Sequence, residues 1–178
     1  MKKVNWETID IKELAILISA HLAKNNISAV LVGGACVSIY SNNKYLSMDL
    51  DYVSFATLKE LKNAMEKIGF YQKSSRHFEH PNCRFFIEFP PGPIAIGQEM
   101  PIKEFKEIKT LTLLTPTDCV KDRLAAYFHW NDPQSLEQAL MVAQAQPVDL
   151  DNVARWSKAE GASDKFFRFE SLFKKGGK

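Results

Sequence analysis

The chain changes its hydrophobic pattern once, near Thr115. Before that point, short apolar runs of strand type alternate with segments in which apolar residues recur at helical spacing. After that point the pattern is helical throughout. This order predicts an α+β fold in which helices flank a mixed β-sheet. We therefore expect an α/β core over residues 1–114 and a C-terminal helical section over residues 115–178, packed on that core.

The expected elements follow from apolar spacing and from the residues that break it. Helices are expected over 7–24, 35–40, 57–68, 116–130, 133–146, 149–160 and 163–175. Strands are expected over 28–32, about 50–55, 84–89 and 108–114, with an irregular strand or hairpin over 70–80. Three prolines in the run 90–93 lack amide donors, so the strand before them ends there and a loop continues to about residue 101.

Helix ends are marked by capping residues at two places. Thr57 is an expected N-cap, and Gly69 ends the helix that it begins. Thr115 is the second expected N-cap, because Pro116 occupies the first helical position and Asp118 lies in the first turn. The helical section should therefore start cleanly after residue 114.

Composition excludes several classes of protein. Hydrophobic residues make up 46% of the 178, enough for a core, and 23 basic against 21 acidic residues give a net charge of only +2. So small an excess argues against avid binding to nucleic acid or to a membrane surface. No segment has the length of a membrane span, and no apolar run follows Met1 as in a signal peptide. Three well-separated cysteines (Cys36, Cys83 and Cys119) indicate reduced thiols, so we expect a cytoplasmic protein.

A double glycine joins an expected strand to an expected helix. The segment Leu31-Val32-Gly33-Gly34 is a buried-strand run that enters a short helix through these two residues. Glycine lets a phosphate group approach the backbone amides at a helix start. Most junctions of this kind are only tight turns, and that reading stays open for the glycines taken alone.

Two aspartates alternate on the next expected strand. In an extended segment, Asp49 and Asp51 point to the same face, about 7 Å apart, while Leu50 and Tyr52 point to the core. Two like charges on one face repel unless a cation neutralises them, and paired carboxylates are hard ligands suited to magnesium. A solvent-facing strand edge is the simpler explanation for the aspartate pair alone.

Glu88 is the only charge among the apolar residues of the strand that follows Arg84. A carboxylate in such surroundings is costly unless it is paired or metal-bound. The sequence leaves two readings open with equal weight. Either Glu88 serves a functional site, or it pairs with Arg84 or Arg76 or lies exposed at the sheet edge.

The three features in this order resemble the nucleotidyltransferase superfamily, which has the polymerase-beta-like fold. The resemblance covers about residues 29–89. It implies that Asp49, Asp51 and Glu88 bind a divalent metal, Mg²⁺ or Mn²⁺. It also implies that Gly33 and Gly34 contact the triphosphate of a nucleoside triphosphate (NTP) substrate.

A finer resemblance is to bacterial nucleotidyltransferase-like proteins related to abortive-infection and toxin–antitoxin systems. These proteins carry a basic residue and a small hydroxyl residue before the aspartates, as Lys44 and Ser47 do here. They also place a lysine on a helix after the sheet, where this chain has Lys121. The resemblance thus implies that Lys44 and Ser47 help to bind the nucleotide and that Lys121 is catalytic. From the residues alone, Lys121 could equally pair with Asp118 or Asp122.

The expected activity is transfer of a nucleoside monophosphate from an NTP to an acceptor, which is protein, RNA or a small molecule. Two alternatives stay open. The same fold could act without turnover, as an antitoxin-like partner of another protein or as a nucleotide sensor. It could also be a metal hydrolase of phosphodiesterase type that uses the same carboxylates.

Two histidine features have simpler explanations than catalysis. The run His77-x-x-His80-x-x-Cys83 contains zinc-type ligands, but no fourth ligand is evident, so residues of a surface loop are the preferred interpretation. His129 ends an expected helix, where a histidine is more often a charge partner than a catalyst.

Overall fold

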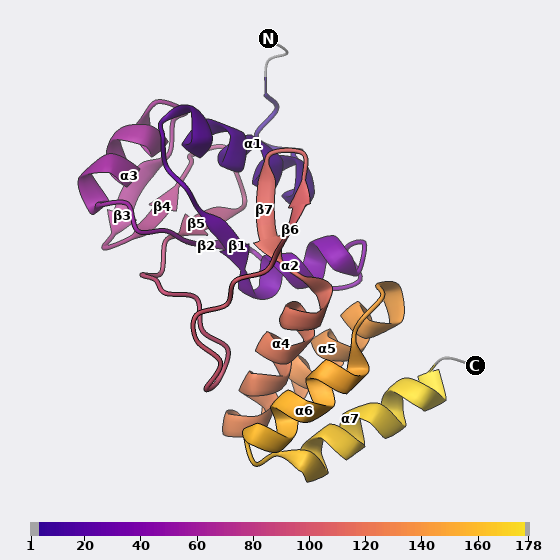
Figure 1. The fold of residues 1–178 in the computed structure, drawn as a ribbon. Coiled ribbons are helices and arrows are strands. Elements are labelled where there is room, and N and C mark those ends of the chain that lie inside the picture. The colour runs from indigo at the N-terminus through magenta and orange to yellow at the C-terminus, as the bar shows by residue number, and fades with distance from the viewer. Residues whose placement is uncertain (1–3, 177–178) are drawn as a thin grey trace.

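The protein is described here by a computed structural model, which covers residues 4–176 (Figure 1). Helices and one mixed β-sheet form an α+β fold, as the sequence predicts. The helices are α1 (Ile11–Lys24), α2 (Gly33–Tyr40), α3 (Leu58–Glu66), α4 (Pro116–Trp130), α5 (Pro133–Ala145), α6 (Leu150–Ala159) and α7 (Ser163–Gly176). The strands are β1 (Val30–Val32), β2 (Asp49–Val53), β3 (Tyr71–Ser74), β4 (His77–Glu79), β5 (Phe86–Glu88), β6 (Phe105–Ile108) and β7 (Leu111–Leu114).

The sheet has the strand order β3-β4-β5-β2-β1-β7-β6. Its centre is mixed, because β2 runs antiparallel to β1 but parallel to β5, and β1 runs parallel to β7. Both ends are antiparallel hairpins, β3–β4 and β6–β7. The strand with the two aspartates therefore lies in the interior of the sheet, with a paired strand on each side.

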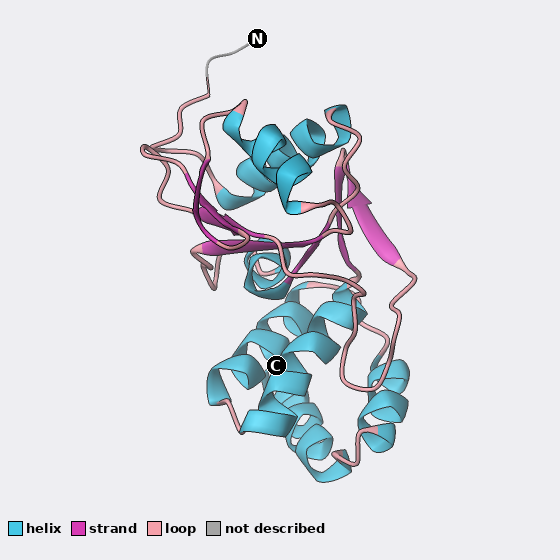
Figure 2. Cartoon of the chain, turned by 90° about the vertical axis from the view of Figure 1, so that its left-hand side faces the viewer, coloured by secondary structure: helices cyan, strands magenta, loops and turns pink. Residues whose placement is uncertain are grey.

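Helices cover the sheet from two sides (Figure 2). One layer contains α1 and α3, and the Tyr52 hydroxyl of β2 donates to the Ala15 carbonyl of α1 at 2.9 Å. On the other side lie α2 and, beyond it, the C-terminal helices (Figures 1 and 2). Leu50 and Tyr52 are both fully buried, as the alternation along β2 predicts.

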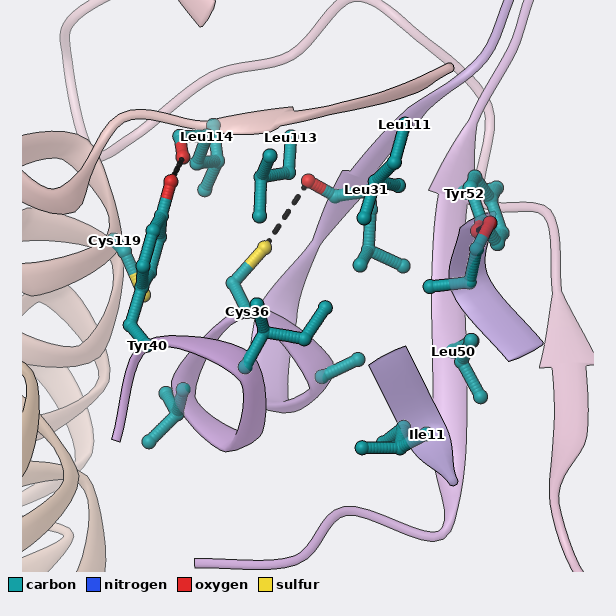
Figure 3. Packing of buried hydrophobic residues seen from close by; sticks show 14 of the residues in the cluster. Ile11, Leu31, Cys36, Tyr40, Leu50, Tyr52, Leu111, Leu113, Leu114 and Cys119 are labelled. Carbon is teal, nitrogen blue, oxygen red and sulfur yellow. Dashed lines mark hydrogen bonds between the residues drawn. The ribbon is translucent and has the colours of Figure 1, made fainter. Parts of the chain in front are cut away.

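The core extends from the sheet into the junction with the helical section (Figure 3). The Tyr40 hydroxyl at the end of α2 donates to the Leu114 carbonyl at 2.6 Å, and the Cys36 thiol donates to the Leu31 carbonyl at 3.2 Å. Cys119 of α4 is buried beside them. The first helix of the C-terminal section is thus packed on the core at the point where the sheet ends.

Several boundaries differ from those expected. Helix α1 begins at Ile11 rather than near residue 7, because Asp10 is the N-cap and accepts from the Lys12 amide. The expected strand 108–114 is wrong as a single element. The chain reverses at Lys109, where φ is +57°, so that residues 105–108 and 111–114 form the hairpin β6–β7. The helix starts at Thr57 and Thr115 are as expected, each with a side chain that caps the third residue of the helix.

The long segment between β5 and β6 reaches the C-terminal helices (Figure 1). We call residues 90–104 the strap. The Trp156 indole donates to the Ile96 carbonyl at 3.3 Å, and the Gln98 amide donates to Glu160 Oε1 at 2.6 Å. Next to Gln98 in the strap, Glu99 Oε2 lies 2.8 Å from Lys121 Nζ. The strap therefore fastens the sheet to α4 and α6.

No helix within residues 4–176 combines the length and the apolar character that a membrane crossing requires. The three cysteines are free thiols, and Cys36 and Cys119 are buried.

Candidate functional site

The proposed carboxylates lie in one row across the sheet. Strand register pairs Val32 of β1 with Asp51 of β2, and Asp51 with Glu88 of β5. Directly paired residues project to the same face of a sheet. Asp49 precedes Asp51 by two residues, so it shares this face too. The two strand neighbours of the aspartates are therefore the glycine turn on one side and Glu88 on the other.

The glycine turn is closed against the aspartates. Gly33 has φ of +70°, and a Cβ atom added there would lie 2.6 Å from Asp51 Oδ2. A Cβ atom on Gly34 would lie 2.7 Å from Ser47 Oγ. A side chain at either position would force Asp51 or Ser47 to move, so the absence of side chains lets the backbone of α2 approach the polar groups of β2.

The start of α2 carries no side-chain cap. Val32 is its N-cap residue and makes no side-chain hydrogen bond, although α1, α3, α4, α5 and α6 are each capped by an aspartate or a threonine. Amides in the first turn of a helix have no partner within the helix, and together with the helix dipole they favour an anion. The backbone next to Asp51 is therefore chemically suited to receive a phosphate group.

Ser47 joins the glycine turn to Asp49. It is buried, its amide donates to Ser38 Oγ at 2.9 Å, and its hydroxyl donates to Asp49 Oδ1. Ser38 in turn donates from its hydroxyl to the Gly34 carbonyl at 3.3 Å. This chain of hydrogen bonds fixes the orientation of Asp49 relative to α2. The structure thus brings together five of the residues singled out from the sequence, namely Gly33, Gly34, Ser47, Asp49 and Asp51.

The carboxylates are crowded electrostatically. Burial first, and then the charges of Asp49 and Glu88, raise the pKa of Asp51 from 3.8 to about 7. Two residues of α4 also act on this carboxyl, because Arg123 lowers its pKa and Asp122 raises it. A cation near Asp51 would relieve the repulsion that raises the pKa.

Glu88 is bound by a histidine. Its Oε1 atom lies 2.9 Å from Nδ1 of His77, which is its register partner on β4. Neither arginine considered from the sequence pairs with it. The Arg76 guanidinium is 3.4 Å from the backbone carbonyl oxygens of Phe89 and Ala56, and Arg84 lies over the ring of Phe85. A cavity of about 290 Å³, lined in part by His77 and Glu88, adjoins the pair.

The two lysines lie apart from the carboxylates. Lys121 is 2% exposed, and its Nζ is 2.8 Å from Glu99 Oε2 and 3.4 Å from Asp118 Oδ1. Lys44 is exposed in the loop between α2 and β2. Among the hydrogen bonds and ion pairs of residues 4–176, none joins either lysine to Asp49, Asp51 or Glu88. Of the two pairings considered for Lys121, the one with Asp118 is present.

Three residues near the site were not singled out for it. His77 was interpreted as part of a surface loop, which is wrong, because it lies in β4 and faces Glu88. His80 points elsewhere and packs 4.4 Å from the ring of Trp6, so the run His77–Cys83 is not a ligand cluster. Asp122 and Arg123 directly follow Lys121 on α4 and change the pKa of Asp51 by their charges, whereas Lys121 is bound by Glu99 and Asp118. Their presence in a charged run was the one signal available.

The donor atoms suit a hard divalent cation. Carboxylate oxygens are the usual ligands of Mg²⁺. Burial first, and then the like charges of Asp49 and Glu88, raise the pKa of Asp51, and a cation would neutralise those charges. Within residues 4–176, no three His, Cys, Asp or Glu side chains are grouped closely enough to hold a metal ion as they stand. Asp49 and Asp51 are the two whose positions are fixed by the glycine turn and by Ser47.

Comparison with protein-family models, with curated proteins and with solved structures found no significant match to this chain. The functional argument therefore depends on the geometry of the site.

Proposed function

We propose that the chain is a metal-dependent nucleotidyltransferase of the polymerase-beta-like fold. The proposal rests mainly on one observation, the closure of the Gly33–Gly34 turn against Asp51 and Ser47. It puts an uncapped helix start, which favours phosphate, next to a pair of carboxylates, which favour a cation. Binding a metal-chelated triphosphate requires both preferences side by side.

Each residue of the site has a role under this proposal. Asp49 and Asp51 would hold Mg²⁺ or Mn²⁺, with Glu88, the register partner of Asp51, as the third carboxylate. The amides at the start of α2 bind the phosphates, and Ser47 keeps Asp49 in place. When bound, the metal ion supplies positive charge to the α-phosphate and to the leaving pyrophosphate.

The proposed transfer is a displacement at the α-phosphorus. The acceptor oxygen forms a bond to that phosphorus, the bond to pyrophosphate breaks, and the acceptor proton passes to a carboxylate. Glu88 suits this role because its side chain is 44% exposed and so lies within reach of an incoming hydroxyl. Arg123 and Asp122 act on the charge of Asp51 from α4 and complete the electrostatic environment.

A second function is a nucleotide-binding or partner-binding module without turnover. The burial of Lys121 and its pairing with two carboxylates favour this function. The resemblance implies that this lysine is catalytic, but its side chain is only 3% exposed and is bound by Glu99 and Asp118. A module that binds a partner would need no lysine free for phosphate. The two functions differ in whether pyrophosphate is released.

The first test is calorimetric titration with ATP, GTP, CTP and UTP in Mg²⁺. The site variant is the double substitution Asp49→Asn/Asp51→Asn. Its matched control is Asp151→Asn/Asp164→Asn, which neutralises two exposed aspartates in the first turns of α6 and α7. We expect Mg²⁺-dependent binding by the wild type and the control, and at least a tenfold loss in the site variant. Binding would also identify the base.

A second assay follows pyrophosphate release with the nucleotide that binds. Release that requires Asp49 and Asp51 supports transfer, whereas hydrolysis without pyrophosphate indicates a metal hydrolase. Binding without turnover favours the non-catalytic module. If the folded wild type binds none of the four nucleotides, the proposal is wrong, and a search for a protein partner becomes the next step.

A further inference from the structure

A row of polar side chains crosses four neighbouring strands on the face that carries the aspartates. On β3, the Tyr71 hydroxyl donates to Glu79 Oε2 at 2.9 Å, and Lys73 Nζ lies 3.5 Å from the same oxygen. On β4, His77 lies two residues before Glu79 and projects to the same face, and its register partner on β5 is Glu88. The row then reaches Asp51 of β2, the register partner of Glu88.

Among these side chains, His77 contacts three neighbours, namely Glu88, Glu79 and Phe86. Its Nδ1 atom is 2.9 Å from Glu88 Oε1, and its Nε2 atom is 3.2 Å from Glu79 Oε1. Its ring stacks on Phe86 with centroids 4.6 Å apart and planes 18° from parallel. The side chain is only 21% exposed. A ring with each nitrogen close to a carboxylate oxygen and one face stacked on Phe86 has little freedom to turn.

Glu88 gains its order from this contact. Its side chain is 44% exposed, and a glutamate with that exposure loses considerable rotamer entropy when a metal ion fixes it. The contact with His77 involves Oε1, so Oε2 keeps its lone pairs for another partner. The register partner of Glu88 on its other side is Asp51 of β2. A histidine that orients a ligand carboxylate is the reverse of the common arrangement in which a carboxylate orients a ligand histidine, and its effect has the same physical origin.

We propose that His77 is a positioning residue that holds Glu88 ready to join Asp49 and Asp51 at a divalent metal ion. This inference rests on the metal site of the proposed function. In its support, Phe86, on which the ring stacks, is the register partner of Asp49. The contacts that fix His77 and the strand pairing that fixes the aspartates therefore belong to the same part of the sheet.

The test is the dissociation constant of Mn²⁺, measured from the electron paramagnetic resonance signal of the free ion. In His77→Asn, the amide nitrogen occupies nearly the position of Nδ1 and can still donate to Glu88. In His77→Gln, the amide nitrogen occupies nearly the position of Nε2 and faces Glu79 instead. His129→Gln, which changes a histidine that pairs with Glu160 of the helical section, is the control. Thermal unfolding of each variant checks that it folds.

We expect His77→Gln to weaken Mn²⁺ binding about tenfold. His77→Asn should bind within about threefold of the wild type, and His129→Gln should match it. This pattern assigns the effect to the Nδ1 contact, because a role in stability alone would not distinguish two amides that differ only in reach.

Other outcomes separate the two proposals. Unchanged or tighter Mn²⁺ binding in a folded His77→Gln variant overturns the positioning role and leaves the metal site standing, provided that Asp49→Asn abolishes binding. Equal losses in the Asn and Gln variants also overturn it, because the loss then does not depend on the Glu88 contact. If the wild type binds no Mn²⁺, or if Asp49→Asn binds as well as the wild type, the metal site itself is wrong and the inference fails with it.

Discussion

At the scale of single residues, the site is defined by close approach. Gly33 and Gly34 are adjacent glycines, yet their backbone conformations and their nearest neighbours differ. Gly33 has a positive φ and faces the carboxylate of Asp51, whereas Gly34 faces the hydroxyl of Ser47 with an ordinary backbone conformation. A side chain added at Gly33 therefore meets both backbone strain and a carboxylate, but one added at Gly34 meets only a small side chain.

We predict that Gly33→Ala destabilises the protein more than Gly34→Ala. The new Cβ would lie 2.6 Å from Asp51 Oδ2, and alanine is strained at a φ of +70°. The expected loss is about 2–3 kcal/mol for Gly33→Ala, against about 1 kcal/mol for Gly34→Ala, where Ser47 can rotate. Urea unfolding of both variants measures the difference. Equal losses would mean that Asp51 turns aside at no cost.

Asp51 gives a second prediction at this scale, which concerns pH. Burial, and then Asp49 and Glu88, raise its pKa to about 7 in the folded protein. Because this pKa lies above the value of 3.8 in the unfolded chain, its contribution to stability is fully present below about pH 4 and is lost as the pH rises through 7. In EDTA, the wild type should therefore lose stability between pH 5 and about 8.

Asp51→Asn removes that loss. At pH 8 in EDTA we expect the variant to unfold about 2–4 °C above the wild type, which corresponds to roughly 1 kcal/mol. Near pH 5 the difference should shrink, since Asp51 is then mostly protonated in the folded wild type. Thermal scans at both pH values measure it, with Asp151→Asn, an exposed aspartate, as the control. A variant less stable than the wild type at pH 8 would contradict the crowding of the carboxylates.

At the scale of elements, the strap is the segment whose role the sequence least reveals. It contacts α4 through Glu99 and α6 through Glu160 and Trp156. The Glu160 side chain is 1% exposed, and a Cβ on Gly97 would lie 2.4 Å from it. Lys121 has a structural role in the same region, because its ammonium group pairs with Glu99 of the strap and with Asp118 of α4.

We predict that Lys121→Met loosens the strap. Glu99 would lose its cation, and Asp118, which is 8% exposed, would keep only its contacts with Thr115. A buried carboxylate left without its cation should lower the free energy of unfolding by about 1–3 kcal/mol. Limited proteolysis should also cut the strap faster. Lys158→Met, at an exposed lysine of α6, is the control, and equal behaviour of the two variants would show that the strap is held without Lys121.

At the scale of the whole molecule, the helical section and the sheet share contacts through several elements. Gln146, which follows α5, donates from its side-chain amide to the Tyr40 carbonyl at 3.0 Å, and Tyr40 donates to Leu114. At the other end, Lys165 of α7 donates to the Phe128 carbonyl and to Asn131 Oδ1 at the end of α4. These links join α7, α4, α2 and the sheet in series, so we expect the chain to unfold as one unit.

Two phenylalanines of α7 test this expectation. Phe169 is fully buried and Phe167 is 69% exposed, so Phe169→Ala should cost about 3–5 kcal/mol and Phe167→Ala less than about 0.5 kcal/mol. In Phe169→Ala, urea curves from circular dichroism and tryptophan fluorescence should still coincide. Hydrogen exchange should accelerate in β1 and β7 as well as in α7. A separate early transition confined to residues 115–176 would show two independent units instead.

The sequence by itself determined most of the helices and strands, and it determined that Asp49 and Asp51 lie on the same face of their strand. Periodicity and capping residues are local, and they were sufficient for α3, α4 and the common face of Asp49 and Asp51. A turn made by an ordinary residue in a left-handed conformation leaves no local mark. For that reason the reversal at Lys109, and with it the β6–β7 hairpin, was not predicted.

Only the tertiary structure decided which charged groups meet. The partner of Glu88 is set by strand register, which brings His77 to it across 11 residues of chain. The packing of α4 decides which of its charges act on Asp51, so Arg123 and Asp122 change the pKa of that carboxyl while Lys121 is bound by the strap. Such pairings form only when the sheet and helices pack together. Packing and burial, rather than local propensity, decide which charged groups meet, so the local sequence does not predict them.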